Sequence, residues 1–531
     1  MNFLNKLLKI LMLLALMLPT FAQENDDEDE GLEVVVTTAT KTEKDILDTA
    51  QAVTALTGTQ LIELGLNNIK DLNNMIPGLY VQNTDTNAPI ITLRGIRTEN
   101  VTELGDPAVG IHVDGVYVAR PQAANALMFD LERTELTRGP QGTLYGRNSV
   151  VGTLNIVTAK PNFDIQGGSL NLEGGQLNQA GLRAHYNLPI NDKLALRFAY
   201  MEQSKDSFLD GYWDGSQLDW RRLPSNITDQ FQAITSPDQR SYLSDYAWYL
   251  GCSTQPGNGC GQGTFADPFT KVKADPADFY TAIQDSAWRV SATYVIDDNA
   301  DINLQYENYE DNGKGWTNVL SCELMKTRQG AMAKDGPANT CTDILGSENR
   351  YQAYANTPGF NKMSMDSFRA IYKRQINETT NLTVNYGYQE LEQSSQFEID
   401  SGVNYQYGMA FNINRLLTES NVLDAYLTGA DDKWAWVGGV FTSTEDNDML
   451  ANFTAELNGH DYFVQPNREL NHYAVYGQAT YALRDDLFFT FGGRFSYDEK
   501  SDVGGRNINC NSGNGCYPQI YGTGGNPFDA I

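Results

Sequence analysis

The chain of 531 residues is poor in the residue patterns from which catalytic and metal sites are built. It has four histidines, and they are scattered rather than spaced as metal ligands. It has no nucleophile elbow, no phosphate-binding loop that ends in Gly-Lys-Ser/Thr and no zinc-protease helix motif. These absences predict that the chain is not an enzyme and that it holds no cofactor or resident metal.

Long apolar runs are also scarce. The main one spans 10–18; it follows Lys6 and Lys9 and precedes a small-x-small sequence at 20–22. This order is typical of a secretory signal peptide, which we predict over 1–22. A single membrane anchor is the alternative, but the run is shorter than the roughly 20 apolar residues that a spanning helix needs. No later stretch supplies such a run, so a mature chain in a membrane would have to cross it with strands.

Basic residues are outnumbered, with 38 Lys and Arg against 67 Asp and Glu, and the formal net charge is −29. Removing 1–22, which contains two lysines and no acids, takes this charge to −31. Nucleic acid is therefore not an expected partner, because phosphate binding needs a concentrated positive surface. Six acids fall within 24–30, and we predict that 23–44 is an acidic, flexible tail.

Cysteine is infrequent, and the six cysteines form three close pairs along the chain. Each pair falls within one predicted long loop, and none falls in a predicted strand. In an exported chain this arrangement predicts three local disulfides. The expected pairs are Cys252 with Cys260, Cys322 with Cys341, and Cys510 with Cys516. Free or metal-binding thiols are the alternative, which the lack of nearby histidines disfavours.

Beyond residue 161 the sequence alternates with a period of two. In 301–307, for example, the apolar residues Ile302, Leu304 and Tyr306 share one face and polar residues occupy the other. Apolar residues outside and polar residues inside are typical of a transmembrane β-barrel, whereas a soluble β-sandwich is the alternative. We predict eleven such strands, at 167–174, 180–188, 193–204, 286–297, 300–310, 365–376, 380–392, 421–429, 432–445, 472–483 and 485–499.

The connections between these strands sort by length, which a soluble sandwich would not require. The tight ones lie at 189–192, 298–299, 377–379, 430–431 and 484, and the long ones at 205–285, 311–364, 393–420 and 446–471. Tight turns are typical of the periplasmic rim of a barrel, and long loops of its outer rim. Eleven strands is an odd number and would leave open sheet edges, whereas bacterial barrels have an even number of strands. Plugged transporters have about 22 strands. We therefore predict that 161–531 is the amino-terminal half of a barrel, and that about eleven more strands follow.

The region at 45–160 has a different pattern. The apolar spacing after Gln60 predicts two short helices that are broken at Gly65 and ended by Pro77. Strands are expected at 89–96 and 110–118, followed by a glycine-rich segment. These features predict a compact mixed α/β domain that precedes the strands.

The segment at 131–160, LERTELTRGPQGTLYGRNSVVGTLNIVTAK, resembles the signature that closes the plug domain of TonB-dependent outer-membrane receptors. Earlier family landmarks stand in the right order, and one departure is Val151, where the family usually has a glycine. The positions that carry the resemblance are Arg94, Gly95, Asp114, Gly115, Arg133, Glu135, Arg138, Gly139, Pro140, Gly142, Tyr145, Gly146, Gly152 and Asn155.

The resemblance implies a mainly β protein in the outer membrane of a Gram-negative bacterium, with the plug at 45–160 inside a barrel embedded in lipid. It also implies import of a scarce ligand, a ferric siderophore by family default, driven by TonB with ExbB and ExbD. In the signature, Arg133, Glu135 and Arg138 either hold the plug against charged barrel walls or pair within the plug. The glycines at 139, 142, 146 and 152 are expected to permit tight turns.

The sequence EVVVTTA at 33–39 resembles the TonB box of such receptors. A Val-rich extended segment on a flexible tether is suited to adding a strand to another protein's sheet. The alternative is a first strand of the plug itself. The residues concerned are Glu33, Val34, Val35, Val36, Thr37, Thr38 and Ala39.

Other functions remain open from the sequence. Aromatic residues in the long loops suit catecholates and sugars equally, so a glycan or a cobalamin-like ligand is an alternative cargo. A passive porin, a surface-adhesion barrel and a soluble secreted β-rich binding protein are rivals of other classes. The plug-sized front region argues against the passive barrels, because they need neither a plug nor a detachable strand.

Overall fold

The computed structural model describes residues 36–38, 40–42, 44–45, 49, 51–83, 89–98, 106–122, 128–214, 271–317, 351–355, 359–398, 409–455, 459–484, 486–502 and 505–510. The expected signal peptide and residues 23–35 of the expected tail lie outside these residues, as do five of the six cysteines. The part of the tail at 36–38, 40–42 and 44 is described, and it is held in place rather than flexible as predicted. Of the segment that resembles a TonB box, the structure describes 36–38.

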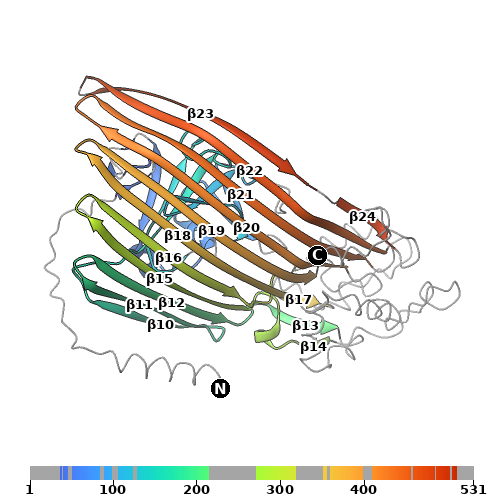
Figure 1. The fold of residues 1–531 in the computed structure, drawn as a ribbon. Helices are drawn as coiled ribbons and strands as arrows, with labels where there is room; N and C mark the ends of the chain where they lie inside the picture. Colours follow the sequence, from blue (N-terminus) through green and yellow to red (C-terminus); the bar gives the residue numbers. More distant parts are fainter. Residues whose placement is uncertain are drawn as a thin grey trace.

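One large antiparallel sheet dominates the described chain, and its eleven main strands follow one another in sequence order. Figure 1 shows it as a curved wall, with the plug elements in blue and cyan on its inner side. The strands are β10 (Gly167–Gly174), β11 (Ala180–Asn191), β12 (Leu194–Lys205), β15 (Ile283–Asp297), β16 (Ala300–Asp311), β18 (Phe360–Asn377), β19 (Thr380–Glu398), β20 (Met409–Ala430), β21 (Trp434–Ala455), β22 (Gly459–Arg484) and β23 (Leu487–Ser501).

All eleven predicted strands are present, and the alternation has the predicted sense. On β16, Asn303, Gln305 and Glu307 are buried, whereas Leu304 and Tyr306 are exposed on the outer face. The polar face is buried because it lies against the plug. The mainly β fold with a plug and a transmembrane-type sheet is thus confirmed for the described residues.

The predicted long connections at 393–420 and 446–471 were wrong. β19 runs to Glu398 and β20 starts at Met409, while β21 runs to Ala455 and β22 starts at Gly459. The ladder continues there although the alternation is lost. Where both faces of a strand meet water or polar neighbours, hydrogen bonds extend the sheet without an apolar face to mark it in the sequence.

A further strand corrects the placement of the cysteines. β24 (Gly505–Cys510) continues along the edge of β22 after β23, with Val464 of β22 opposite Gly505 and His460 opposite Cys510. Cys510 therefore lies in a strand and not in a loop as predicted. Whether the three expected disulfides form is outside the described residues.

The plug is built around a five-stranded sheet of order β3-β8-β9-β6-β7, in which β6 and β9 are parallel. The core is apolar, with Leu72, Leu93, Ile111, Leu136 and Ile156 fully buried. A separate pair of strands, β4 (Leu79–Asn83) and β5 (Pro89–Leu93), packs beside it. The sheet strands are β3 (Ala52–Thr57), β6 (Val109–Val113), β7 (Val116–Val118), β8 (Leu131–Arg138) and β9 (Gly152–Thr158).

The two predicted short helices of the plug are present. α2 (Gly58–Glu63) begins at a capping box formed by Thr57 and Gln60. The second, η2 (Ile69–Asn74), is a 3₁₀ helix whose first turn is capped in the same way by Asn68 and Asp71. Among the described residues, no helix is both long and apolar enough to cross a bilayer.

Two small sheets complete the fold. β1 (Val36–Thr37) pairs with β2 (Lys44–Asp45) ahead of the plug. At the end of the wall opposite the tight turns, β14 (Lys271–Lys273), β13 (Asp210–Asp214) and β17 (Gln352–Ala355) form a three-stranded sheet beside η6 (Pro276–Asp278). Phe279 and Tyr280 are fully buried against this sheet. The predicted loops 205–285 and 311–364 therefore contain ordered structure.

Candidate functional site at the plug and wall interface

The latch segment, which we define as 36–38 and 40–42, is held by the plug signature. The Thr37 Oγ1 donates to Glu135 Oε2 at 3.0 Å, and the Thr38 backbone N–H donates to the same oxygen at 3.0 Å. Asn155 Nδ2 donates to Thr38 Oγ1 at 2.9 Å, and the Tyr145 hydroxyl donates to the Thr38 carbonyl at 2.9 Å. Three of the predicted motif residues therefore meet on the described part of the segment that resembles a TonB box.

The charges of the signature pair mainly within the plug. Arg133 Nε donates to Glu135 Oε1 at 2.7 Å, and Arg133 also pairs with Glu132. For Arg133 and Glu135 the structure thus agrees with internal pairing rather than contact with the barrel wall. Arg138 lies at the end of β8, opposite Ala52 of β3 and Gly152 of β9. The contacts with the wall are made by other residues.

Lys41 makes one of these contacts with the wall. Its ammonium pairs with Asp424 of β20, and both side chains are less than a tenth exposed. It lies 4.9 Å from the ring centres of Tyr426 and Tyr476 and 5.7 Å from that of Tyr145. Burial lowers the pKa of Lys41, and the nearby Asp424 carboxylate opposes that shift. We call Asp424, Tyr145, Tyr426 and Tyr476 the Lys41 cage.

A buried histidine lies next to this cage. His112 of β6 packs edge-on against Tyr145, with ring centres 4.8 Å apart, and against Tyr117 at 5.6 Å. Burial, together with the smaller effects of the Lys41 and Arg494 charges, lowers its pKa to about 3. His112 is therefore neutral at physiological pH. Its ring adds no positive charge beside Lys41.

Gly146 brings the plug signature close to β23. Its φ of +79° is left-handed, and an added Cβ would lie 2.6 Å from the Arg494 guanidinium carbon. Gly139 is also left-handed, with φ +105°. The expectation of a tight turn was wrong for Gly152, which lies within β9 and is required because a Cβ there would come within 2.3 Å of the Thr137 carbonyl oxygen.

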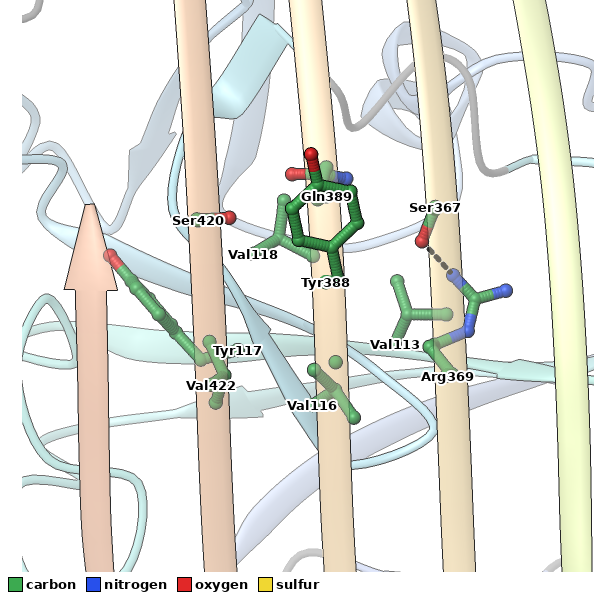
Figure 2. A pocket seen from close by; sticks show the side chains of 11 residues that line it. Val113, Val116, Tyr117, Val118, Ser367, Arg369, Tyr388, Gln389, Ser420 and Val422 are labelled. Atoms are coloured by element: carbon green, nitrogen blue, oxygen red, sulfur yellow. Dashed lines mark hydrogen bonds between the residues drawn. The ribbon is translucent and has the colours of Figure 1, made fainter. Parts of the chain in front are cut away.

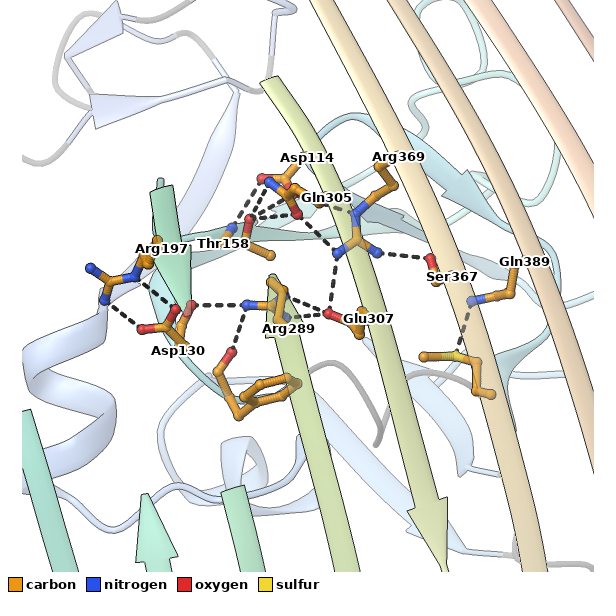
Figure 3. Close-up of polar contacts among 12 residues, drawn as sticks. Asp114, Asp130, Thr158, Arg197, Arg289, Gln305, Glu307, Ser367, Arg369 and Gln389 are labelled. Atoms are coloured by element: carbon orange, nitrogen blue, oxygen red, sulfur yellow. Dashed lines mark hydrogen bonds and ion pairs between the residues drawn. The ribbon is translucent and has the colours of Figure 1, made fainter. Parts of the chain in front are cut away.

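The opposite side of the plug is fastened by buried ions, which Figure 3 shows. Glu307 of β16 is fully buried and accepts from Arg289 Nε at 2.6 Å and from Arg369 Nη2 at 3.2 Å. Arg369 Nε lies 3.7 Å from Asp114 Oδ2 at the plug turn between β6 and β7. Asp114 in turn accepts from the Thr158 backbone N–H at 3.0 Å and from its hydroxyl at 2.7 Å.

Asp130 extends this ionic cluster toward β12. Arg197 donates to its carboxylate twice, from Nε at 2.9 Å and from Nη2 at 2.5 Å. Arg289 Nη1 donates to the carbonyl oxygens of Phe129 and Asp130 at 3.1 and 3.2 Å, and its guanidinium lies 4.3 Å from the Phe129 ring centre. Paired, bidentate contacts of this kind fix geometry as well as charge. The plug is therefore bonded to β12, β15, β16 and β18.

Two predicted landmarks lie away from both clusters. Arg94 and Gly95 form the exposed turn after β5, where the Arg94 N–H donates to the Gly78 carbonyl at 2.8 Å. Pro140 and Gly142 lie in the exposed connection after β8. Among the described residues, no group of three or more His, Cys, Asp or Glu is placed to hold a metal ion.

The plug tip packs closely on the wall. A cavity of only about 20 Å³ separates β6 and β7 from β18, β19 and β20, as Figure 2 shows. It is lined by Val116 and Tyr117 of the plug and by Arg369 and Val422 of the wall, among others. Such a space holds at most about one water molecule. A larger cavity of about 730 Å³ lies toward the tight turns and is bounded by Lys41, Asp114 and the turn at 297–301.

Sequence reasoning missed the wall residues of both clusters. Glu307 had a visible signal, because it is a charged residue on the polar face of a predicted strand. Nothing in the sequence singled out Lys41 or Asp424, which are 383 positions apart. Their meeting depends on the placement of the whole plug inside the wall.

Residues 45–153 match the family described as the TonB-dependent receptor plug domain. The pesticin receptor of Yersinia pestis is 32% identical over 182 residues, which are 34% of this chain and 26% of the relative. The ferrioxamine B receptor of Salmonella typhimurium strain SL1344 is 30% identical over 202 residues, 36% of this chain and 27% of the relative. The chain thus matches about a quarter of the length of these curated relatives.

The fold extends further than the sequence match. The crystal structure of the ferric yersiniabactin uptake receptor from Yersinia pestis superimposes with a TM-score of 0.60 and 15% sequence identity. The similarity covers 87% of this chain and 61% of that one. It therefore includes the described wall strands as well as the plug.

Proposed function

Since the chain belongs to the TonB-dependent receptor family and is located in the outer membrane of a Gram-negative bacterium, we propose that it imports a ferric siderophore into the periplasm with energy supplied through TonB, ExbB and ExbD. The observation that carries the proposal is the latch segment, held between the plug signature and the barrel wall. Such a device has a purpose in a transporter that must be opened by a pull from the periplasm. It has none in a passive pore.

The geometry defines what the energy must accomplish. The plug is fastened to the wall by the ionic cluster on one side, and on the other by the Lys41 cage and by a buried ion pair between Arg120 and Glu445 of β21. Removing a partner from a buried ion pair costs on the order of 3–5 kcal/mol. Ligand binding at the outer loops alone does not readily supply enough free energy to break several such contacts. A mechanical pull on a segment that leads directly into the plug would break them in sequence.

The latch segment is suited to receive that pull. The backbone of Val36 and Thr37 pairs with Lys44 and Asp45 in a two-residue ladder, which is too short to be stable by itself. Once freed, the same extended backbone would be able to add to the edge of a TonB sheet. We propose 33–39 as the TonB-binding segment on this basis, with 1–22 as the signal peptide, 23–44 as a tail that is held at the latch segment, 45–160 as the plug and 161–531 as barrel wall.

The ligand class is supported by the names of the relatives, which include a ferrioxamine B receptor and a ferric yersiniabactin uptake receptor. These differ in siderophore chemistry, so we propose the class and not one compound. A glycan or a cobalamin-like ligand remains the alternative cargo. The iron complex is the substrate and not a resident cofactor of the chain.

The proposal is tested by deleting 33–39 in the complete gene, with deletion of the acidic 24–30 as the matched control. Cells are given radiolabelled ferrioxamine B, ferric yersiniabactin, a ferric catecholate and cobalamin, and binding is measured separately from uptake. We expect the first deletion to abolish uptake of one ferric siderophore while binding persists, and the control to transport normally. Uptake that continues without 33–39, or in cells that lack TonB, would instead favour a passive barrel. Uptake of cobalamin alone would replace the siderophore as cargo.

A further inference from the structure

We propose that Lys41 is the positioning residue that ties the latch segment to the barrel wall, and that the surrounding cage controls how readily this segment is released. The biological meaning of the inference rests on the proposed function, because release matters only if a partner pulls on the segment. The contacts themselves, and their test, do not require transport. Three of the four cage residues belong to the wall strands β20 and β22, so the wall takes part in holding the latch segment.

The first step is the chemistry of the cage. A primary ammonium that is buried must be compensated, and here one carboxylate and three aromatic faces surround it. Aromatic faces attract cations most strongly when water is excluded. The Tyr476 hydroxyl donates to Asp424 Oδ1 at 2.8 Å, which orients the carboxylate toward Lys41. The arrangement is therefore a built site for one lysine side chain.

The second step is that the cage joins three parts of the molecule. Lys41 comes from the latch segment, Tyr145 from the plug, and Asp424, Tyr426 and Tyr476 from the wall. The bonds of Thr37 and Thr38 given above end on plug residues, so they would travel with the plug. The contact of Lys41 with Asp424 instead spans the boundary between moving and fixed parts.

The third step is that the cage continues into the wall. Arg494 of β23 lies 5.3 Å from the Tyr476 ring centre, and its Nη2 is 3.1 Å from His472 Nε2. His472 Nδ1 is 2.6 Å from Asp498. The same Arg494 packs on Gly146 of the plug signature. A displacement of β22 or β23 would therefore reach the cage through contacts on both the wall and the plug, but coupling must be measured rather than read from proximity.

The test measures amide hydrogen exchange in the complete receptor in outer-membrane vesicles without ligand. The reporter is the Thr38 amide, which is protected by its bond to Glu135. The variants are Lys41→Met, Asp424→Asn, the double variant and Tyr476→Phe. Lys44→Met is the matched control, because Lys44 lies only three residues further on, in β2, but is exposed.

We expect Lys41→Met and Asp424→Asn each to speed exchange of the Thr38 amide by on the order of 100-fold, since each leaves a buried partner uncompensated. The double variant should show much less than the product of the two effects, because the two residues act as a pair. Tyr476→Phe should give about a fivefold increase from the loss of one hydrogen bond. The control should change exchange less than about twofold.

Equal exchange in Lys41→Met and Lys44→Met would overturn the role of Lys41, whatever the receptor transports. If Lys41→Met also loses protection along β20 and β21, this substitution has damaged the barrel itself. The test of the inference is then the exchange of the Thr38 amide in Tyr476→Phe. Faster Thr38 exchange with an intact wall supports the inference, and unchanged exchange overturns it. A receptor with the expected exchange pattern but no TonB-dependent uptake would contradict the proposed function and leave the Lys41 cage standing.

Discussion

The plug is attached to the wall on two sides by different chemistry. On the side of β12 to β18, three guanidinium groups and three carboxylates bind one another and the plug backbone, as in Figure 3. On the side of β20 to β23, the Lys41 ammonium lies among tyrosine rings beside Asp424, and Arg120 of the plug forms a separate buried ion pair with Glu445 of β21. Both sites exclude water. In the ionic cluster the charges are distributed over several hydrogen bonds and ion pairs, whereas the Lys41 ammonium pairs with one carboxylate.

This difference has a mechanical consequence. In the ionic cluster each planar guanidinium donates in fixed directions to several acceptors, so displacement of the plug breaks many directional bonds together. The Lys41 ammonium is at the end of a flexible four-carbon chain and meets rings that tolerate a range of positions. The ionic cluster therefore suits a lasting anchor, and the Lys41 cage suits a fastening that opens. The experiments below test that contrast.

The largest effect is expected from Glu307→Gln. The neutral amide leaves the guanidiniums of Arg289 and Arg369 without the carboxylate between them, in a site that is closed to water. Removing one partner of a buried pair costs about 3–5 kcal/mol. We expect the β9 amides of the plug, which include the Thr158 N–H bound to Asp114, to lose protection by that amount in hydrogen exchange.

Glu310→Gln on the same strand is the matched control, because Glu310 is exposed. Its effect on the β9 amides should be within experimental error. If Glu307→Gln changed protection no more than Glu310→Gln does, the ionic side would not be an anchor. The comparison between the two sides would then fail.

A smaller effect on the aromatic side is expected from pH through His112. Its pKa is lowered to about 3 by burial and by the charges of Lys41 and Arg494, so the unfolded plug binds a proton more readily than the folded plug between that value and the ordinary histidine pKa of 6.5. Its contribution to stability is therefore full above about pH 6.5 and declines as the pH falls, by about 1.4 kcal/mol per unit.

The measurement is the protection of the β6 amides at about pH 7.5 and about pH 5.5, corrected for intrinsic exchange, in the parent and in His112→Asn. The groups that face His112 are Tyr117, Tyr145, Lys41 and Arg494. Burial raises the pKa values of the two tyrosines, so both stay neutral in this range, whereas burial lowers the pKa of Lys41, and the comparison with His112→Asn separates its contribution from that of the histidine. We expect the parent to lose about 1.4 kcal/mol of protection and the variant to lose much less. An identical pH slope in both would assign the dependence to another group.

The sequence anticipated the fold where physical constraints act locally. Lipid on one face and plug on the other impose alternation, which located all eleven strands. It failed at the outer ends, where β20 begins at Met409 and β22 at Gly459, because strands beyond the lipid have no apolar face to reveal them. The tight turns were located because the alternation of apolar and polar residues continues in the strands on both sides of each turn.

The site was anticipated less completely. The signature residues Glu135, Tyr145 and Asn155 were identified by resemblance, and the structure places them around Thr38. Their partner could not be foreseen, since it depends on how the segment before the plug folds back. The pairs between Asp114 and Arg369 and between Lys41 and Asp424 link residues hundreds of positions apart. No local pattern records such distances; only the docking of plug into wall creates them.

The smallest effect is expected from Glu173→Gln, at a partly exposed contact between plug and wall. Glu173 of β10 accepts from Asn67 Nδ2 of the plug at 3.4 Å and lies 3.7 Å from Arg183 Nε, and both charged side chains are partly exposed. Long, hydrated pairs of this kind contribute at most about 1 kcal/mol. Protection of the η2 amides should therefore fall by no more than about 0.5 kcal/mol. A loss comparable to that of Glu307→Gln would mean that a hydrated, partly exposed contact holds the plug as strongly as a buried ion pair, and burial would then not distinguish the anchor from weaker contacts.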